Sequence, residues 1–333
     1  VAARLGARST LEETRTERFI GIAGRTKTHL LPIPLKYYAA HTGRWGGSDS
    51  VNLQNLPSRG AQGGKLKRCI IAPKGHVIID CDSAQIEARV LAWLAGEVGI
   101  LRKFANKEDV YKYMAGLIYN KFETEISADE RFIGKTTVLG AGYGMGAIKF
   151  QRQLQTMGKY VDLDTCKYII KQYRQSNRFI ASWWNHLNAV LFNILANRPM
   201  DSIDFADVLS VSSFTGIQLP NGLFLNYPDL RKETDGQFSY MTRYGRNRIY
   251  VGKVIENVCQ ALARIVIGKQ MLLVAKKYRV VMTVHDAIAC IVPEDQAAIA
   301  QENIEMLMKV RPAWALELPL SCEAGSGKTY GDC

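Results

Sequence analysis

The sequence predicts an α+β fold in which a mostly helical block is inserted between two regions that supply strands. Residues 97–200 carry apolar side chains at spacings of three and four, the period of an amphipathic helix. Before this block lies the short β-rich run His76–Cys81, and after it come short apolar runs separated by Asn-Gly, Asp-Gly and Gly-Arg turns. This order is typical of an α+β core with a helical insertion.

The individual elements are expected in the following order. A short helix at Leu11–Ile20 precedes a Gly- and Asn-rich loop region at Tyr37–Gly64, the strand at His76–Cys81 and a helix at Gln85–Leu94. Six helical segments follow: Leu101–Phe104, Val110–Tyr119, Arg131–Tyr143, Ile148–Met157, Tyr168–Tyr173 and Ile180–Leu195. Four strands come next: Phe214–Leu219, Leu223–Tyr227, Phe238–Thr242 and Arg248–Val251. Last are a long helix at Val254–Ala275, strands at Val280–Val284 and Ala287–Val292, and a helix from Glu294.

The composition favours a globular protein with a polyanionic partner. The 333 residues carry a net charge of +12, and neutralising phosphates with such a surplus releases counterions. No stretch approaches the roughly 18 apolar residues of a membrane span, and Val1–Thr10 lacks the apolar core of a signal peptide, so we expect no membrane partner. The seven cysteines are scattered and form no CxxC pair, which argues against disulfides and zinc and fits a reducing cytosol.

Two glycine-rich segments imitate nucleotide-binding motifs. Gly142–Ala147 satisfies the loose form GxGxxA, but a helical pattern precedes it where a dinucleotide fold needs a strand. Gly325–Thr329 (GSGKT) imitates a P-loop, but Cys322 stands where the motif needs its first glycine. We therefore discount both.

Two aspartates stand at predicted strand ends. Asp82 follows the run HVIIDC, and Asp286 lies between the runs RVVMTV and AIACIV, at the tip of a predicted hairpin. Two carboxylates that face each other from neighbouring strands can hold two divalent ions roughly 3.5–4 Å apart, and magnesium prefers such oxygen ligands. Taken singly, each aspartate fits a structural role better than a metal site: Asp286 as a turn residue and Asp82 as a helix cap.

A basic stripe is expected on the helix that begins near residue 128. Ser127 and Glu130 form a capping box that marks its start. Four side chains at spacings of four then form one slowly winding stripe about 18 Å long: Arg131, Lys135, Leu139 and Tyr143. The two cations add to the positive end of the helix dipole, so a triphosphate could lie there and a base near the aromatic end. The alternative is an amphipathic helix with a solvated basic edge.

Several motifs in one order resemble those of the family A DNA polymerases, the DNA polymerase I type. The pattern D-x-x-Q-I-E-x-R (Asp82–Arg89) resembles motif A, R-x3-K-x7-Y-G (Arg131–Gly144) motif B, and V-H-D (Val284–Asp286) motif C. Thr42–Pro57 and Glu256–Ile267 resemble the stretches before motifs A and C. The similarity runs from about Tyr37 to the C-terminus and is greatest to phage-encoded members.

The resemblance implies a right-hand polymerase palm, an antiparallel sheet with helices, that carries an inserted helical fingers subdomain, with the thumb largely missing. Residues 1–36 would lead into the palm, 37–96 would form its first part with motif A, 97–212 the fingers with motif B, and 213–333 the second palm part with motif C. Residues 1–36 are too few for a full thumb and an exonuclease-type domain. Either the natural protein is longer or another chain supplies these functions, and we expect no proofreading or 5′-nuclease activity here.

The resemblance also implies roles for single residues. Asp82 and Asp286 match the metal-binding aspartates and Ser83 the backbone ligand, for two Mg²⁺ ions that Mn²⁺ can replace; Lys135 is a candidate to protonate the leaving pyrophosphate. The implied dNTP contacts are Ser83, Gln85, Glu87, Tyr111, Arg131, Lys135, Leu139 and Tyr143. The implied primer-template contacts are Arg44, Gln54, Asn55, Gln260 and His285. Glu87 matches the steric gate against a 2′-OH.

Four positions depart from the family pattern. Ala287 stands where a glutamate is frequent, Leu139 where Phe or Tyr is frequent, and Tyr111 where a histidine near the phosphates is frequent. Asp80 adds a carboxylate on the same face of the strand as Asp82, without an assigned role.

The implied activity is template-directed addition of dNTPs to a primer 3′-OH, in DNA replication in the cytoplasm, that of a bacterial host if the protein is phage-encoded. A separate exonuclease or processivity subunit is a candidate partner. One alternative is a single-subunit phage-type RNA polymerase, which shares the R-x3-K and His-Asp patterns; Glu87 favours deoxynucleotides. Another is a catalytically inert nucleic-acid-binding subunit, against which the intact aspartate pair argues.

Overall fold

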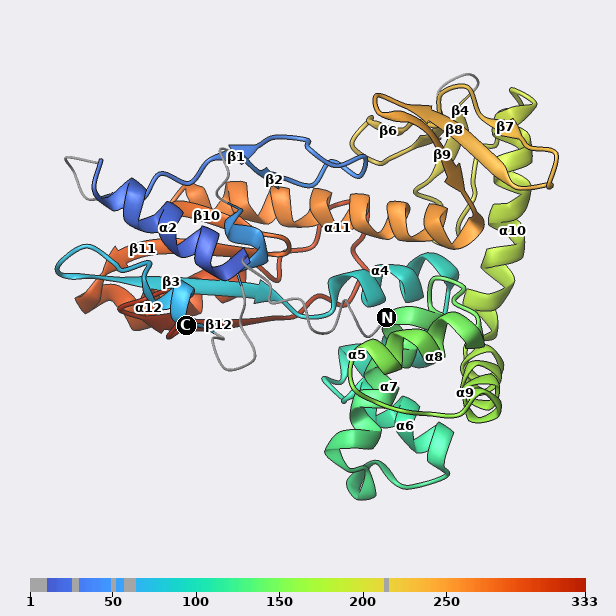
Figure 1. Cartoon of the computed structure of the whole chain (residues 1–333), viewed down its shortest axis with the longest axis horizontal. Helices are drawn as coiled ribbons and strands as arrows, with labels where there is room; N and C mark the ends of the chain where they lie inside the picture. Colours follow the sequence, from blue (N-terminus) through green and yellow to red (C-terminus); the bar gives the residue numbers. More distant parts are fainter. Residues whose placement is uncertain (1–10, 26–29, 49–51, 57–63, 213–215) are drawn as a thin grey trace. The chain divides into compact units, whose positions relative to one another are not determined.

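The chain forms two compact units in a computed structural model that describes residues 11–25, 30–48, 52–56, 64–212 and 216–333. Unit 1 comprises Val1–Ala84, Ile267–Val310 and Cys322–Cys333, and unit 2 comprises Gln85–Val266 and Arg311–Ser321. Unit 1 is built around a sheet and unit 2 around helices (Figure 1). The α+β class is thus confirmed.

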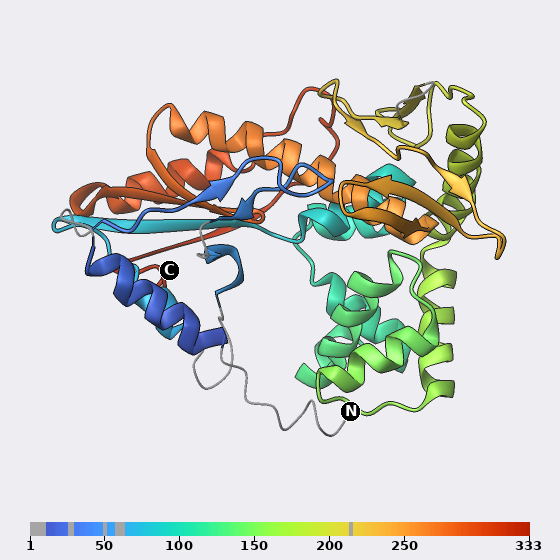
Figure 2. The same ribbon diagram turned by 45° about the horizontal axis from the view of Figure 1, so that its top comes forward.

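Unit 1 contains a four-stranded antiparallel sheet of order β10-β11-β3-β12. Its strands are β3 (His76–Ser83), β10 (Arg279–Val284), β11 (Ala287–Pro293) and β12 (Cys322–Gly327). β3, the earliest of these four strands in the sequence, thus lies between strands from the far end of the chain, as the cyan strand among orange and red ones in Figure 2 shows. Three consecutive residues of β3, Val77 to Ile79, are buried, so both faces of the sheet are covered.

Each face of this sheet is covered by a different part of the chain. Helix α12 (Ala297–Leu307) follows the short η3 (Glu294–Gln296) and packs on β3, β11 and β12. On the other face, Ile78, Met282 and Ala289 pack with Leu66 of α3 (Lys65–Arg68) and side chains of α2 (Leu11–Ala23). The remaining elements are β1 (Leu35–Lys36), β2 (Gly46–Gly47) and η1 (Leu53–Asn55).

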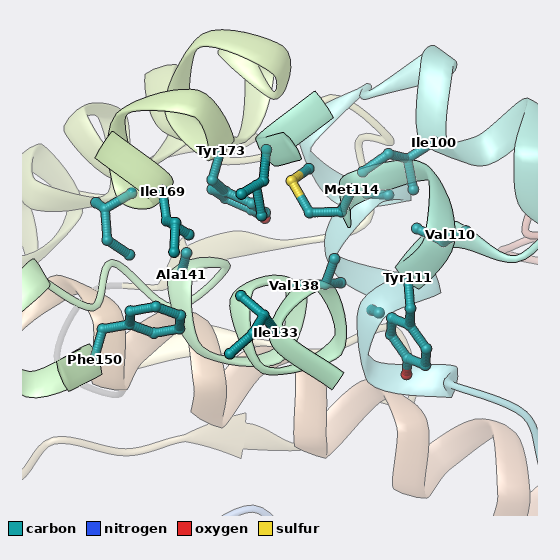
Figure 3. Packing of buried hydrophobic residues seen from close by; sticks show 14 of the residues in the cluster. Ile100, Val110, Tyr111, Met114, Ile133, Val138, Ala141, Phe150, Ile169 and Tyr173 are labelled. Carbon is teal, nitrogen blue, oxygen red and sulfur yellow. The ribbon is translucent and has the colours of Figure 1, made fainter. Parts of the chain in front are cut away.

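Unit 2 is mainly helical. Its helices are α4 (Ile86–Ala95), α5 (Val98–Ala105), α6 (Val110–Tyr119), η2 (Glu123–Glu125), α7 (Ala128–Ala141), α8 (Ala147–Thr156), α9 (Leu163–Ser176) and α10 (Arg178–Leu195). Their apolar faces meet in one core, in which side chains from α6, α7, α8 and α9 converge (Figure 3): Met114, Ile133, Phe150, Ile169 and Tyr173. Amphipathic periodicity in the sequence therefore corresponds to real burial.

Two small sheets complete unit 2. The first contains β4 (Ser210–Ser212), β5 (Gly216–Gln218) and β6 (Phe224–Leu225), and the second β7 (Arg231–Lys232), β8 (Phe238–Thr242) and β9 (Gly245–Ile249). The second sheet packs on α10, because the rings of Phe192 and Phe238 lie 5.0 Å apart. Helix α11 (Val251–Ala275) follows and continues into unit 1.

Most predicted elements are confirmed, with boundary errors. The helix predicted at Arg131–Tyr143 ends at Ala141, and the strand predicted at Arg248–Val251 is β9, which ends at Ile249. Strands β4, β7 and β12 were not predicted. Part of the loop region Tyr37–Gly64 and the start of the strand Phe214–Leu219 lie outside the described residues. Both discounted nucleotide motifs are confirmed as unrelated, since a helix precedes Gly142 and Gly325–Gly327 lie in β12.

Helix α11 corrects the expectation that no stretch is apolar enough for a membrane span. Its 25 residues meet that test by length and composition. Half of the tested window is buried within the protein, and one such helix is weak evidence for a membrane segment, because buried core helices pass the same test.

The core of unit 2 predicts that a Leu-to-Ala exchange lowers the free energy of unfolding much more at a buried position than at an exposed one. Leu154→Ala removes a fully buried side chain of α8, and we expect it to lower the free energy of unfolding by about 2–5 kcal/mol. Leu316→Ala, at an exposed leucine of the same unit, serves as the control and should change it by less than about 0.5 kcal/mol. Urea unfolding followed by circular dichroism measures both. Equal effects of the two exchanges would contradict this packing.

Candidate active site

Strand pairing brings the two predicted metal-binding aspartates together in unit 1. Asp82 is the next-to-last residue of β3, and its partner across the ladder is Ala287, the residue after Asp286. The Ser83 amide donates a hydrogen bond to the Asp286 carbonyl at 3.2 Å. Asp286 lies in the two-residue turn between β10 and β11, where His285 adopts a left-handed conformation with φ of 53°. The predicted juxtaposition at one end of the sheet is therefore observed.

This end of the sheet concentrates negative charge. Burial raises the pKa of Asp82 to about 7, and the nearby carboxylates of Asp286, Asp80 and Glu323 act in the same direction, whereas Lys67 lowers it. A carboxyl with such neighbours favours its neutral form unless a cation offsets the repulsion. Hard oxygen donors and unbalanced negative charge are what a magnesium ion needs. The donor set thus fits a divalent ion.

Asp80 belongs to the same electrostatic environment. Burial raises its pKa to about 6, and Lys67 partly opposes this. Its Oδ1 is buried and has no hydrogen-bond partner among the described residues. Within that part of the chain, no group of three or more His, Cys, Asp or Glu side chains is arranged as a metal cage. Any ion here would keep coordination positions for other ligands.

The helix of motif B, α7, is in unit 2 and begins as predicted. Ser127 Oγ accepts from the Glu130 amide, and the Glu130 carboxylate accepts from the Ser127 amide at 2.9 Å. Arg131 and Lys135 then lie on one aromatic ring, 5.4 Å and 5.7 Å from the centroid of Tyr111. Tyr111 therefore holds both cations on its π-face. It stands at the position where the family pattern frequently has a histidine.

The ion pair that Arg131 makes was not predicted from the sequence. Arg131 Nε donates to Asp109 Oδ2 at 2.6 Å. Asp109 is also the N-cap of α6, where its Oδ1 accepts from the amides of Tyr111 and Lys112. Burial alone would raise the pKa of Asp109, but the hydrogen bonds from Arg131 and the amides outweigh it and lower the pKa. The position of Asp109 directly before an apolar run marks it as an N-cap, but this signal does not indicate its pairing with Arg131.

Glu87 and Tyr143, predicted to lie near the sugar and the base of a nucleotide, are directly bonded. Tyr143 Oη donates to Glu87 Oε2 at 2.9 Å. Burial raises the pKa of the Tyr143 hydroxyl, and the negative groups near it act in the same direction. Burial raises the pKa of Tyr111, and a hydrogen bond that the Gln85 side chain donates to its hydroxyl opposes this. The start of α4 is thus tied to α6 through Gln85 and to Tyr143 through Glu87.

The turn that carries Tyr143 is held by its surroundings. Trp184 Nε1 of α10 donates to the Gly142 carbonyl at 3.0 Å. Gly252 of α11 lies so close that a Cβ there would stand 2.0 Å from the Tyr143 carbonyl oxygen. Beside this turn is a cavity of about 860 Å³ whose wall includes Leu139, Tyr143, Lys149, Trp184, Tyr250 and Glu256.

The predicted primer-template residues lie in both units. In unit 1, the carbonyl of Arg44 accepts hydrogen bonds from the amides of Ala39 and Ala40. Gln54 and Asn55 belong to η1, and His285 lies in the β10–β11 turn of the same unit. Gln260 is on α11 in unit 2, where its Nε2 donates to Glu256 Oε1 at 3.2 Å. Their roles stay predictions.

Comparison with known proteins establishes the family. The model of DNA polymerase family A matches residues 9–191, and the chain belongs to that family. The DNA polymerase of Bacillus phage SP02 is 27% identical over 86% of this chain and 50% of its own length. DNA polymerase I of Pseudomonas aeruginosa is 25% identical over 88% of this chain and 29% of its own length. The chain thus spans half or less of these relatives.

A solved structure shares the fold. The POL domain of Pol1 from M. smegmatis, in complex with DNA primer-template and dNTP, superposes with a TM-score of 0.71 over 97% of this chain and 51% of that one, at 18% identity. The fold of a family A polymerase domain is therefore confirmed, and with it the predicted resemblance.

The capping box predicts a pH dependence of stability. The hydrogen bond from Lys121 and those from Ser127 lower the pKa of Glu130 from 4.5 to about 2. An acid with a lowered folded-state pKa stabilises the fold above its unfolded pKa, and this contribution is lost as pH falls toward 2. Glu130→Gln should therefore flatten the decline in the free energy of unfolding between pH 4.5 and pH 2, measured by urea unfolding.

The matched control is Glu302→Gln, at an exposed glutamate of α12 for which no ion pair is found among the described residues. It should leave the acid decline unchanged. An acid decline of the same steepness in the Glu130→Gln variant and in the wild type would contradict the assignment.

Proposed function

We propose that this chain is the polymerase part of an enzyme that adds dNTPs to a primer 3′-OH under the direction of a template. The observation that carries the proposal is the proximity of Asp82, near the end of β3, to Asp286, in the turn directly before β11. Membership of DNA polymerase family A supports it. Action in DNA replication, in the cytoplasm, and with a separate exonuclease or processivity subunit belongs to the same proposal, as does the division into palm and fingers.

Asp82, Asp286 and the backbone carbonyl of Ser83 would hold Mg²⁺ in this proposal, or Mn²⁺ in its place. Two bound ions would supply activation of the primer hydroxyl and neutralisation of charge on the leaving pyrophosphate. The carboxylates would stay ionised with the ions bound, since a cation offsets the repulsion that raises the pKa of Asp82.

Arg131 and Lys135 would bind the triphosphate. Both side chains lie over the ring of Tyr111, and Arg131 also lies in the N-terminal part of α7, near the positive end of the helix. A triphosphate that binds Arg131 has to compete with Asp109 for the guanidinium. Lys135 would also donate the proton that the pyrophosphate takes up as it leaves.

Glu87, held by Tyr143, would select the sugar. The hydrogen bond between them fixes the carboxylate, so that its bulk excludes a 2′-OH. Leu139 and Tyr143 would contact the base, and Ser83 and Gln85 the rest of the dNTP. Arg44, Gln54, Asn55, Gln260 and His285 would contact the primer-template, where minor-groove acceptors shared by all correct pairs permit a check of shape.

The aspartate pair generates the most direct prediction. Asp82→Asn and Asp286→Asn keep the shape of each side chain and remove its charge, and each should lower Mg²⁺-dependent primer extension at least 10³-fold. Affinity for the primer-template should change less than threefold. Gel-resolved extension and fluorescence anisotropy measure the two quantities, and near wild-type extension by both variants would overturn the metal assignment.

The Glu87–Tyr143 bond predicts how sugar selection fails. Glu87→Ala removes the bulk and should raise incorporation of rNTPs relative to dNTPs at least tenfold. Tyr143→Phe is the matched comparison, because it removes only the hydrogen bond that fixes the carboxylate and keeps the bulk of Glu87, so it should raise rNTP incorporation by a smaller factor than Glu87→Ala. Single-nucleotide extension with each nucleotide type measures this. A wild-type preference for NTPs would instead identify an RNA polymerase.

The Asp109–Arg131 pair predicts that a carboxylate outside the proposed dNTP contacts affects nucleotide binding. Asp109→Asn keeps an N-cap side chain but weakens the competitor for Arg131, so the KM for dNTP should fall two- to fivefold, a size typical of a partly exposed ion pair. Steady-state extension against dNTP concentration measures it. A KM that rises would mean that Asp109 orients Arg131 for the nucleotide.

A further inference from the structure

The helices α8 to α10 carry a large excess of positive charge. Residues 147–198 contain eight lysines and arginines and only two acidic residues, Asp162 and Asp164, so this segment supplies half of the net charge of the chain. The buried core of unit 2 does not require these cations, because they lie outside its apolar cluster. Their concentration in one segment therefore indicates a negatively charged partner.

Few of these cations are neutralised. Lys159 pairs with Asp129 at 2.8 Å and Lys167 with Asp164 at 2.8 Å. Both side chains of the second pair are mostly exposed, where an ion pair contributes little. Over the described part of the chain, no ion pair is found for the other six cations: Lys149, Arg152, Lys171, Arg174, Arg178 and Arg198.

Three cations form one face of α9. Lys167, Lys171 and Arg174 stand at i, i+4 and i+7, and together span about 10 Å along the helix. The opposite face packs into the core through Ile169 and Tyr173, which Figure 3 shows pointing into the cluster. The basic face is therefore turned to solvent.

This face continues to the cavity beside the Tyr143 turn. The guanidinium of Arg174 lies 5.6 Å from the ring centroid of Trp184, and Trp184 lines that cavity together with Lys149. We call the set Lys149, Trp184, Arg174, Lys171 and Lys167 the α9 strip. The exposed ring of Tyr168, three residues before Lys171, adds an aromatic surface next to it.

We propose that the α9 strip binds the single-stranded part of the template that has not yet been copied. Cations that follow one line and aromatic faces between them are the combination that holds single-stranded nucleic acid without sequence preference. The strip leads away from the turn that carries Tyr143, which the proposed function places beside the nascent base pair. The inference rests on that function and adds a partner for a surface outside the aspartate and α7 sites.

The test measures how affinity depends on the length of the template overhang. Primer-templates with one duplex and a 5′ overhang of one or twelve nucleotides are titrated by fluorescence anisotropy, without dNTP or Mg²⁺. The wild type should bind the long overhang at least fivefold more tightly. The double variant Lys171→Gln/Arg174→Gln should lose this advantage and bind the short overhang as the wild type does. For this variant on the long overhang, the slope of log K against log [salt] should become less negative by about 1.4, which is about 0.7 for each lost phosphate contact.

Two controls make the outcome specific. Lys276→Gln/Lys277→Gln removes two exposed lysines at the end of α11 and should keep the advantage of the long overhang. Arg174→Lys retains the charge and should keep the salt slope. An equal loss for both overhangs, no loss at all, or the same loss in the α11 control would overturn the proposal. Unfolding midpoints within one degree of the wild type exclude a fold defect.

The proposed function is tested separately in the same material. Mg²⁺-dependent filling of the one-nucleotide overhang does not need the α9 strip. Absence of filling by the wild type, with the overhang dependence of binding intact, would overturn the polymerase activity and leave a single-strand-binding surface. Filling without any overhang dependence would overturn only the strip.

Discussion

The antiparallel pairing of β3 with β11 is the constraint on which the proposed chemistry depends. Asp82 and Asp286 repel each other, and burial adds to the cost of their charges. What holds them together is backbone: the ladder that places Ala287 opposite Asp82, and the bond from the Ser83 amide to the Asp286 carbonyl. The buried run Val77 to Ile79 anchors β3 on both faces. Hydrophobic burial thus stabilises an arrangement that electrostatics alone would oppose.

The motif B site is preorganised by different means. In α7 the cations are arranged by side chains, through the ring of Tyr111 and the carboxylate of Asp109. Such contacts exchange readily, since an ion pair that is partly exposed contributes little free energy. A rigid acidic site on a sheet and an adjustable basic site on a helix suit their proposed ligands, because ions need fixed oxygens whereas a triphosphate enters and leaves in each cycle.

The sequence predicted best what depends on local periodicity. The helices of unit 2 and the hairpin around Asp286 follow from spacing and turn residues, and the aspartate pair follows from its strand ends. Strand β12 was missed because Cys322–Gly327 is rich in glycine and gains its structure only from pairing with β3. The bond from Arg131 to Asp109 was missed for a related reason: it joins two residues 22 positions apart, on α7 and at the N-cap of α6, and no local pattern marks them as partners.

The close approach of α6 and α7 explains why Tyr111 can serve both cations. A Cβ on Gly134 would lie 2.2 Å from the Tyr111 carbonyl oxygen, so only glycine permits the two helices to pack at this distance. Gly134 directly precedes Lys135 and follows Arg131 by three positions, so the contact point falls between the two cations along α7. The ring of Tyr111 is thereby placed beneath both. A single residue without a side chain thus determines the geometry of a site to which it contributes no functional group.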